Sequence, residues 1–345
     1  MKKLTFVAGL SLLGCVFAQP VRAADEAVIQ EVLAILKERG IVDEARYGEL
    51  VEKSKAYETK QGSLLSKIVW TGDFRARLEN FWFDEDSLGG EPDNRHRGRY
   101  RLRLGATVPV NEWLTAGFRL ASGELDPRST NRTLGTGNDF DRDAFEIDEA
   151  FLQLKLPIEA GSTSFVFGKQ SNPFLWKNGK DYMNWDPDYN PEGLSLRWSM
   201  QPTDSASVFA NAGYFLIDEN GSEKDPHFFA LQAGGQLEAA EHLAFGGRAT
   251  WFSYHSLNSG FFTRHGLFGN VGLSDGSSLD QIELSAYGRA TYSEAWPVLV
   301  HGHFAKNLDA ANLAGEGEQD TGWGVAVEVG DPKEFVMLGV GYYAL

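Results

Sequence analysis

Four arginines at alternate positions are the first feature of this chain that points to chemistry. They belong to a run whose other members are mostly apolar. The arginines are Arg97, Arg99, Arg101 and Arg103, and the alternating partners are Tyr100, Leu102, Leu104, Ala106 and Val108. Because successive side chains of a β-strand face opposite sides of the sheet, this run predicts a strand with one basic face and one apolar face.

Six further arginines fall on the polar side of other expected strands. They are Arg75, Arg77, Arg119, Arg197, Arg248 and Arg289. An arginine at mid-depth in lipid costs roughly 2–4 kcal/mol, so we expect both groups of arginines to face water as the lining of a pore. Charged walls set ion preference in pores. Two interpretations stay open: a cationic half of a constriction, or a wet wall whose arginines pair with Asp and Glu.

A long segment rich in aromatic residues, 171–192, supplies the second set of candidate residues. An exposed loop tip does not favour so many apolar rings, so we expect this segment to fold into the lumen and narrow it. Its acidic side chains are then expected to face the arginine wall. The candidate constriction residues are Trp176, Asp181, Trp185, Asp186, Asp188 and Glu192.

The end of the same segment also has the alternate oxygen spacing of a calcium loop. The residues in question are Asp186, Asp188, Asn190 and Glu192. The rest of an EF-hand is absent, and Pro187 and Pro191 interrupt the spacing. A turn with capped carboxylates is the alternative. No cofactor and no other metal site is expected.

A hydrolase is the weakest interpretation of the sequence. Tyr254-His255-Ser256 and His265 lie close together in the chain. No Gly-x-Ser-x-Gly motif and no metal-ligand spacing accompanies them. We therefore expect no catalytic residues.

Period-two alternation continues from residue 67 to the end and predicts an all-β chain of about 13 strands. The expected strands are 67–82, 97–109, 112–122, 146–157, 162–170, 193–200, 205–217, 227–238, 241–254, 279–293, 296–306, 320–330 and 334–344. Short and long connections alternate between them. That alternation is typical of a transmembrane antiparallel β-barrel, with short periplasmic turns and long external loops. The net charge of −16 argues against nucleic acid as a partner.

An odd strand count does not suit a bacterial barrel, which has an even number of strands and both termini inside. The chain also ends without the terminal aromatic residue of a closing strand. We therefore expect the barrel, residues 67–345, to be incomplete at its C-terminus. A complete member is expected to have 16 strands.

The N-terminal residues predict export. A basic start, an apolar middle and small residues before Ala23 make residues 1–23 a secretory signal peptide. Leu12-Leu13-Gly14-Cys15 also resembles a lipobox, so lipoprotein processing at Cys15 is an alternative. The following segment, 24–62, has apolar residues at helical spacing, with Gly40 ending one helix and Asp43 capping the next. This periplasmic hairpin is interpreted either as a spacer or as an oligomerisation module.

Several of these stretches together resemble the putative porin family of Gram-negative outer membranes. The resemblance rests on Gly40-Ile41-Val42-Asp43-Glu44, Gly72-Asp73-Phe74-Arg75-Ala76-Arg77, Phe167-Gly168-Lys169-Gln170-Ser171-Asn172-Pro173-Phe174 and Trp185-Asp186-Pro187-Asp188-Tyr189-Asn190-Pro191-Glu192-Gly193. It implies a 16-stranded diffusion channel whose full-length members are longer than this chain.

The expected function is therefore a passive outer-membrane pore for small hydrophilic solutes, with a possible anion preference. Outer-membrane lipid is the expected surrounding, and the assembly stays open between a homotrimer and a monomer. A structural or adhesion barrel without transport is the alternative.

Overall fold

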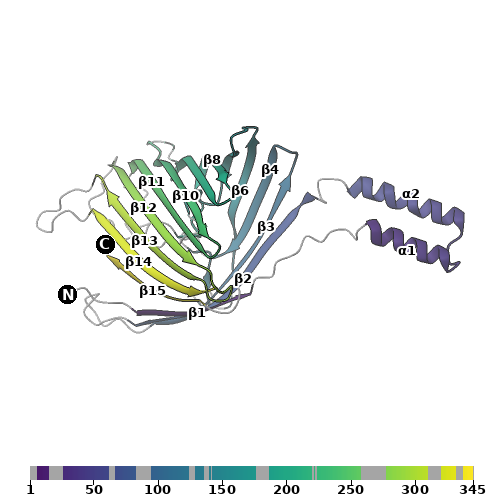
Figure 1. Cartoon of the computed structure of the whole chain (residues 1–345), viewed down its shortest axis with the longest axis horizontal. Helices are drawn as coiled ribbons and strands as arrows, with labels where there is room; N and C mark the ends of the chain where they lie inside the picture. The colour runs from purple at the N-terminus through teal and green to yellow at the C-terminus, as the bar shows by residue number, and fades with distance from the viewer. Residues whose placement is uncertain are drawn as a thin grey trace, which may run out of the picture.

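One large antiparallel sheet and a separate helical hairpin make up the chain in the computed structural model (Figure 1). The structure describes residues 6–14, 26–61, 67–82, 95–123, 129–135, 140, 142–175, 186–219, 221, 224–257, 277–309, 320–331 and 337–344. No helix among these residues is long and apolar enough to cross a membrane.

The predicted helical hairpin is confirmed as α1 (Glu26–Glu38) and α2 (Glu44–Gln61), which lie side by side away from the sheet (Figure 1). Gly40 has a φ of 69°, and the amide of Ile41 returns to the carbonyl of Leu36 at 3.0 Å. A left-handed residue with such a bond is a common helix C-terminus, and glycine adopts it without strain. Asp43 then caps α2, because its Oδ1 accepts the amide of Arg46 at 2.7 Å.

Replacing Asp43 with alanine is expected to destabilise the start of α2 by about 0.5–2 kcal/mol. The alanine side chain leaves the amide of Arg46 without an acceptor. Hydrogen exchange at that amide should therefore accelerate by roughly 2- to 30-fold. Asp43→Asn is the matched control, since asparagine also caps helices, and it should keep most of the protection. Equal exchange in the alanine variant and the parent would contradict the cap.

The predicted strands are confirmed with small shifts at their ends. They are β2 (Val69–Trp82), β3 (Arg95–Pro109), β4 (Leu114–Ser122), β6 (Phe145–Leu156), β7 (Ser162–Lys169), β8 (Glu192–Thr203), β9 (Ala206–Leu216), β10 (His227–Ala240), β11 (Leu243–Leu257), β12 (Ser277–Ala290), β13 (Val298–Asn307), β14 (Thr321–Gly330) and β15 (Met337–Ala344). The sequence did not predict two strands, β1 (Phe6–Gly14) and the two-residue β5 (Arg132–Thr133).

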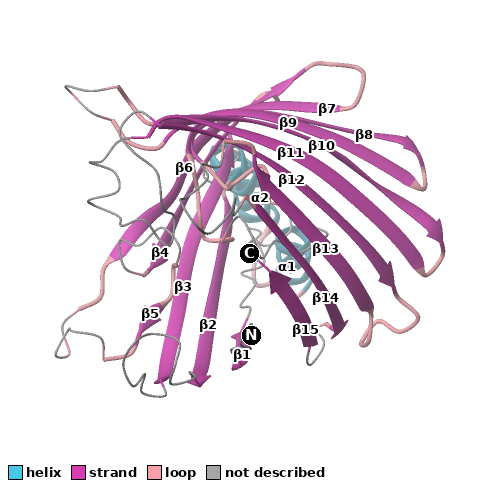
Figure 2. Ribbon diagram, turned by 90° about the vertical axis from the view of Figure 1, so that its left-hand side faces the viewer, coloured by secondary structure: helices cyan, strands magenta, loops and turns pink. Residues whose placement is uncertain are grey.

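The sheet curls into an open trough, and each long strand pairs antiparallel with the next along the chain (Figure 2). Only β5 departs from this order, because it pairs with β3. In the part of the chain that the structure describes, β1 and β15 form the two edges of the sheet and do not pair with each other.

β1 lies inside the segment predicted to be a signal peptide. It pairs with β2 in a register that sets Leu10 opposite Leu78. A strand edge presents unpaired N–H and C=O groups that any extended apolar segment can satisfy, which accounts for the pairing. Removal of residues 1–23 during export stays a prediction.

The burial of side chains along the strands is the reverse of that in a soluble protein, because charged side chains are buried and apolar side chains are exposed. In β3, Arg101 is 8% exposed, whereas Leu102 and Leu104 are each 44% exposed. In β2, Glu79 is buried and the adjacent Leu78 is exposed. The sheet therefore has a concave face of buried polar groups and a convex face of exposed apolar groups, as the alternation predicted.

Candidate functional site

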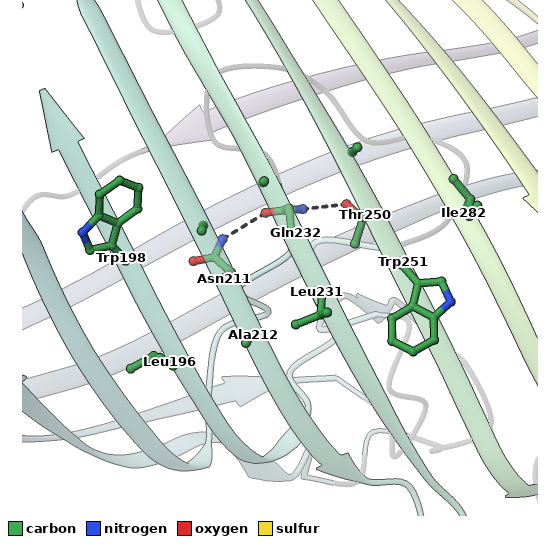
Figure 3. A pocket seen from close by; sticks show the side chains of 12 residues that line it. Leu196, Trp198, Asn211, Ala212, Leu231, Gln232, Thr250, Trp251 and Ile282 are labelled. Atoms are coloured by element: carbon green, nitrogen blue, oxygen red, sulfur yellow. Dashed lines mark hydrogen bonds between the residues drawn. The ribbon is translucent and has the colours of Figure 1, made fainter. Parts of the chain in front are cut away.

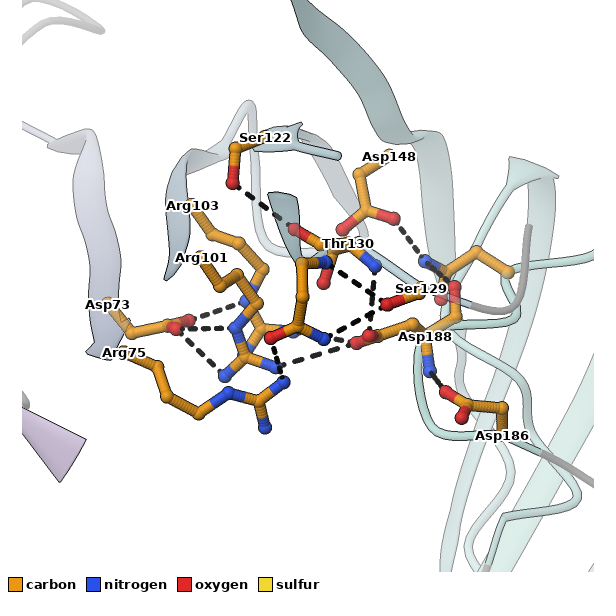
Figure 4. Close-up of polar contacts among 12 residues, drawn as sticks. Asp73, Arg75, Arg101, Arg103, Ser122, Ser129, Thr130, Asp148, Asp186 and Asp188 are labelled. Carbon is orange, nitrogen blue, oxygen red and sulfur yellow. Dashed lines mark hydrogen bonds and ion pairs between the residues drawn. The ribbon is translucent and has the colours of Figure 1, made fainter. Parts of the chain in front are cut away.

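The first half of the site is a cluster of arginines and carboxylates from β2, β3, β4, β6 and the segment before β8; Figure 4 shows the part of it around Asp73, Arg101 and Asp188. We call it the arginine cluster. Its arginines are Arg75, Arg77, Arg97, Arg99, Arg101, Arg103 and Arg119, and its carboxylates are Asp73, Glu79, Asp148, Glu149 and Asp188.

Two carboxylates of β2 hold most of the arginines of β3. Asp73 lies 2.8 Å from Arg101 and 2.5 Å from Arg103. Glu79 lies 2.5 Å from Arg97 and 2.8 Å from Arg77 on its own strand. Most arginines of this wall therefore lie in ion pairs with carboxylates.

The long segment between β7 and β8 contributes a further carboxylate to this cluster. Asp188 Oδ1 lies 3.5 Å from Arg101 and 3.8 Å from Arg103, and its Oδ2 accepts the amide of Thr130 at 3.0 Å. Asn190 donates to Asp148 Oδ1 at 2.6 Å. Asp148 also lies 2.5 Å from Arg119. We call residues 186–191 the second arm of this segment. Through Asp188 and Asn190 this arm is bound to the arginine wall.

Residues 129–131 were missed by the sequence interpretation, although they accept hydrogen bonds from two arginines. Arg75 donates to Asn131 Oδ1 at 2.6 Å. Arg99 donates to Ser129 Oγ and to the carbonyl of Asn131, each at 2.9 Å. These partners are neutral. Among the described residues, the seven arginines of the cluster therefore outnumber its five carboxylates.

The first arm of the same segment, residues 171–175, packs against β9, β10 and β11. The Phe174 ring is 0% exposed and packs edge-on against Phe215 and Phe252, with ring centroids 6.1 and 5.6 Å away. Phe228 and Ala230 complete this buried cluster. The sequence predicted an inward fold from the aromatic content of the segment, but gave no indication of where its rings dock.

Polar side chains of the concave face hold the backbone at Phe174. Arg248 and Gln232 both donate to the Phe174 carbonyl, Gln232 at 2.9 Å. Asn211 donates to the carbonyl of Pro173 at 3.0 Å. Arg248 is in turn held by Glu283 at 2.6 Å, and their side chains are 0% and 1% exposed. We call the Phe174 carbonyl with Arg248 the loop anchor.

Figure 3 shows the neutral row beside this anchor, in which Gln232 accepts from Asn211 and donates to Thr250, each at 2.9 Å. The same three residues are among those that line a hollow of about 460 Å³ along β8–β12, whose apolar side chains Leu196, Leu231 and Trp251 belong to the exposed convex face. The apolar residues that line most of the hollow include Leu196, Trp198, Leu231, Trp251 and Ile282.

The base of the segment is set by two glycines that face each other across β7 and β8. Gly168 and Gly193 are paired and have φ values of 117° and 157°, a region that glycine adopts readily. Just beyond them, Gln170 accepts from Ser195 at 2.6 Å and from Arg197 at 2.7 Å. Arg197 also donates to the carbonyl of Ser171 at 3.0 Å.

The remaining predicted loop residues divide into two groups. Trp176, Asp181 and Trp185 lie outside the described residues. Asp186 is described, and burial raises the pKa of its carboxyl above the ordinary range. Glu192 lies 2.8 Å from Lys169.

The calcium spacing coincides with a capped turn. Asp186 Oδ1 accepts the amide of Asp188 at 2.8 Å, and the Asp186 carbonyl accepts the amide of Tyr189 at 3.0 Å. Over the described part of the chain, no group of three or more His, Cys, Asp or Glu side chains is arranged to hold a metal ion.

Two other predicted residues lie away from this site. Arg289 is 4.0 Å from Glu238, and both side chains are substantially exposed. His255, from the segment considered for hydrolysis, lies 3.0 Å from Ser253 Oγ, and His265 is outside the described residues. Ser253 is buried and donates to Asp280, so the acid binds the hydroxyl and not the imidazole. This order of contacts differs from that of a catalytic triad.

Comparison with known proteins finds a matching family and solved structures that are similar to much of the chain. A sequence model of the family described as "Putative porin" matches residues 87–264. OprB of Pseudomonas putida, solved at high pH, is 13% identical with a TM-score of 0.50, over 83% of this chain and 77% of that chain. No curated protein matches.

Two further solved structures resemble the chain less closely. OmpT, an outer membrane protein of Vibrio cholerae in its trimer form, is 14% identical over 79% of this chain and 88% of that chain, with a TM-score of 0.41. The outer membrane channel DcaP of Acinetobacter baumannii is 13% identical over 80% and 88%, with a TM-score of 0.39.

Proposed function

The chain belongs to the putative porin family, and from that premise we propose that it is a passive diffusion channel for small hydrophilic solutes, narrowed by the segment between β7 and β8. Its location is the bacterial outer membrane. The exposed apolar convex face suits acyl chains, and the buried polar concave face suits a wet lumen. No catalytic step is part of this proposal.

The observation that carries the proposal is the fastening of this segment on both sides. Its first arm is held at the loop anchor, and its second arm joins the arginine cluster through Asp188. A segment fixed at both arms across a concave face is suited to narrow the space beneath that face. The described loop residues Asp186, Asp188 and Glu192 are proposed as members of the constriction, together with Trp176, Asp181 and Trp185.

We further propose a preference for anions. The excess of arginines over carboxylates in the arginine cluster supports it, because a water-filled cleft lined by one sign of charge concentrates the opposite ion. Arg197 and Arg248 are proposed to contribute mainly through the loop, to whose backbone they donate. Arg289 is proposed to line the periplasmic end.

A homotrimer is proposed as the assembly. The support is an apolar stripe on α1 that α2 leaves exposed, in which Val32 and Ile35 are 49% and 44% exposed. Chemical crosslinking of the detergent-solubilised protein should give a band at three times the monomer mass. Val32→Glu combined with Ile35→Glu should weaken that band if the stripe is the contact.

Reconstitution into a planar lipid bilayer is the direct test of the channel. Insertion of the folded protein should produce discrete current steps that are linear in voltage and scale with salt concentration, because a wet pore conducts without a binding step. Heat-modifiable mobility on a gel verifies folding in the same sample. A folded protein that gives no current steps would favour a structural or adhesion barrel.

Deleting residues 176–185 is expected to raise single-channel conductance by roughly 1.5- to 3-fold, since it shortens the segment proposed to narrow the lumen while keeping Phe174 and Asp188. Conductance in symmetric salt is the measurement. Deletion of 311–318, from another long connection, is the control and should leave conductance unchanged. Equal conductance with and without 176–185 would place this stretch away from the conducting path.

A further inference from the structure

A chain of buried polar contacts crosses four strands of the concave face, from β14 to β11, and ends at the loop anchor. Glu283 of β12, which holds Arg248, accepts from Ser285 Oγ at 3.3 Å. Ser285 lies 3.0 Å from His303 Nδ1, and Arg248 Nε donates to the same hydroxyl at 3.4 Å. The loop anchor therefore shares one partner, Ser285, with His303.

The other end of the chain is a pair of adjacent histidines on β13. His301 Nδ1 lies 3.1 Å from His303 Nε2, and His301 Nε2 lies 3.8 Å from Glu328 of β14. The two residues are 2% and 5% exposed. We call them the histidine pair. No sequence motif marked them, because alternate histidines in a strand are unremarkable without their neighbours.

We propose that the histidine pair is an acid-sensitive switch that controls how firmly the constriction segment is held at the loop anchor. This inference rests on the proposed function, since it assigns a regulation to the same segment. Its basis is the 3.1 Å contact between two ring nitrogens, which can accommodate a single proton.

The protonation states follow from the donors and acceptors along the chain. With one proton added to the neutral pair, His303 donates through Nδ1 to Ser285 and through Nε2 to His301 Nδ1. The N–H on His301 Nε2 then faces Glu328 at 3.8 Å, which is beyond hydrogen-bond length, and the Ser285 hydroxyl donates to Glu283. Each of the three hydrogen bonds that join Glu283, Ser285, His303 and His301 has one donor and one acceptor in this state.

A second proton has no place in this geometry. It would put an N–H on His301 Nδ1, directly facing the N–H of His303 Nε2, and two cationic rings would then lie in contact. The rings must separate, and His303 leaves Ser285, which loses its orientation toward Glu283 and Arg248. Arg248 then gains freedom from its two partners, and the Phe174 carbonyl loses a fixed donor.

Five other charged or titratable side chains face the histidine pair from neighbouring strands in the described part of the chain. They are Arg248 of β11, Glu283 and Tyr287 of β12, Glu328 of β14 and Tyr343 of β15, which is paired with Gly324. The Tyr287 hydroxyl donates to Gln236 of β10 at 2.6 Å. Glu283 and Glu328 lie at the two ends of the chain of contacts, and neither lies between the two rings.

Single-channel recording of the full chain at about pH 7.5 and about pH 4.5, on either side of the ordinary histidine range, tests the switch. Acidification should raise conductance by roughly 1.5- to 2-fold in the parent protein as the segment is released. The His301→Gln/His303→Gln variant should lose this response, because its amides do not titrate. His255→Gln, on the convex side of β11, is the control and should keep the response.

Phe174→Ala tests whether the response acts through the segment. It keeps the backbone carbonyl that accepts from Arg248 but removes the ring that packs on Phe215 and Phe252. Because its segment is held less firmly, it should show a higher conductance than the parent at about pH 7.5 and a smaller further change on acidification. If the double histidine variant fails to fold, His301→Gln alone serves, because one neutral side chain removes the repulsion between two cations. A parent without pH response, or a response that survives in the folded glutamine variants, would overturn the switch. Absence of conductance at both pH values would instead contradict the channel itself.

Discussion

Replacing Glu283 with glutamine is expected to lower the free energy of unfolding by about 3–5 kcal/mol, because it leaves a buried guanidinium without its counter-charge. Arg248 and Glu283 are the most deeply buried ion pair among the described residues, with side chains 0% and 1% exposed. The Phe174 carbonyl and Ser285 still accept from Arg248, but neither carries a charge. The measurement is the urea midpoint of unfolding in detergent micelles, read by heat-modifiable mobility.

Two further variants distinguish this explanation from a general loss of stability. Glu238→Gln removes a strand carboxylate that is 44% exposed and 4.0 Å from Arg289, and it should change stability by no more than about 0.5 kcal/mol. Arg248→Met combined with Glu283→Met removes both charges, and should recover much of the loss seen in Glu283→Gln. A Glu283→Gln midpoint equal to that of the parent would mean that the charge of Arg248 is balanced by another group.

The strands and the hairpin were predictable from the sequence because their signals are local. Alternation of side chains depends only on the residue itself and its two neighbours, so Arg101 between Tyr100 and Leu102 already indicates a basic face. The hairpin was equally local, since Gly40 and Asp43 terminate and start helices through bonds that span a few residues. The unpredicted β5 is two residues long and has no alternation to detect.

The candidate site was only partly predictable, because its contacts join residues far apart in the chain. The sequence placed acids of the 171–192 segment near the arginines. It did not distinguish Asp188, which forms an ion pair with Arg101 of β3, from Glu192, which pairs with Lys169. The docking of Phe174 depends on Phe215 and Phe252 from two other strands. Neutral partners such as Asn131 carry no charge pattern, so nothing in the sequence marked them.

Pairing within the arginine cluster sharpens the prediction about ion selectivity. Replacing Arg99, Arg101 and Arg103 together by serine should shift the pore toward cations, because it leaves the cluster with fewer arginines than carboxylates. Asp73 and Asp188 then lose partners that lie 2.5–3.8 Å away and contribute uncompensated negative charge. The measurement is the reversal potential in a salt gradient across a planar bilayer, and Arg289→Ser, outside the cluster, is the control with a small expected shift.

Asp188→Asn is expected to shift the reversal potential in the opposite direction. Asparagine has nearly the same shape, and its single side-chain oxygen keeps one of the two contacts that the Asp188 oxygens make with Thr130 and Arg101. Removing one carboxylate raises the excess of arginines, so the reversal potential should move toward anion preference. Opposite shifts in the two variants would show that the net charge of this wall governs selectivity. Shifts of the same sign, or none in either, would mean that ions pass too far from the wall to sense its charge. The sign of each shift, which depends on charge alone, separates this effect from any change in pore width.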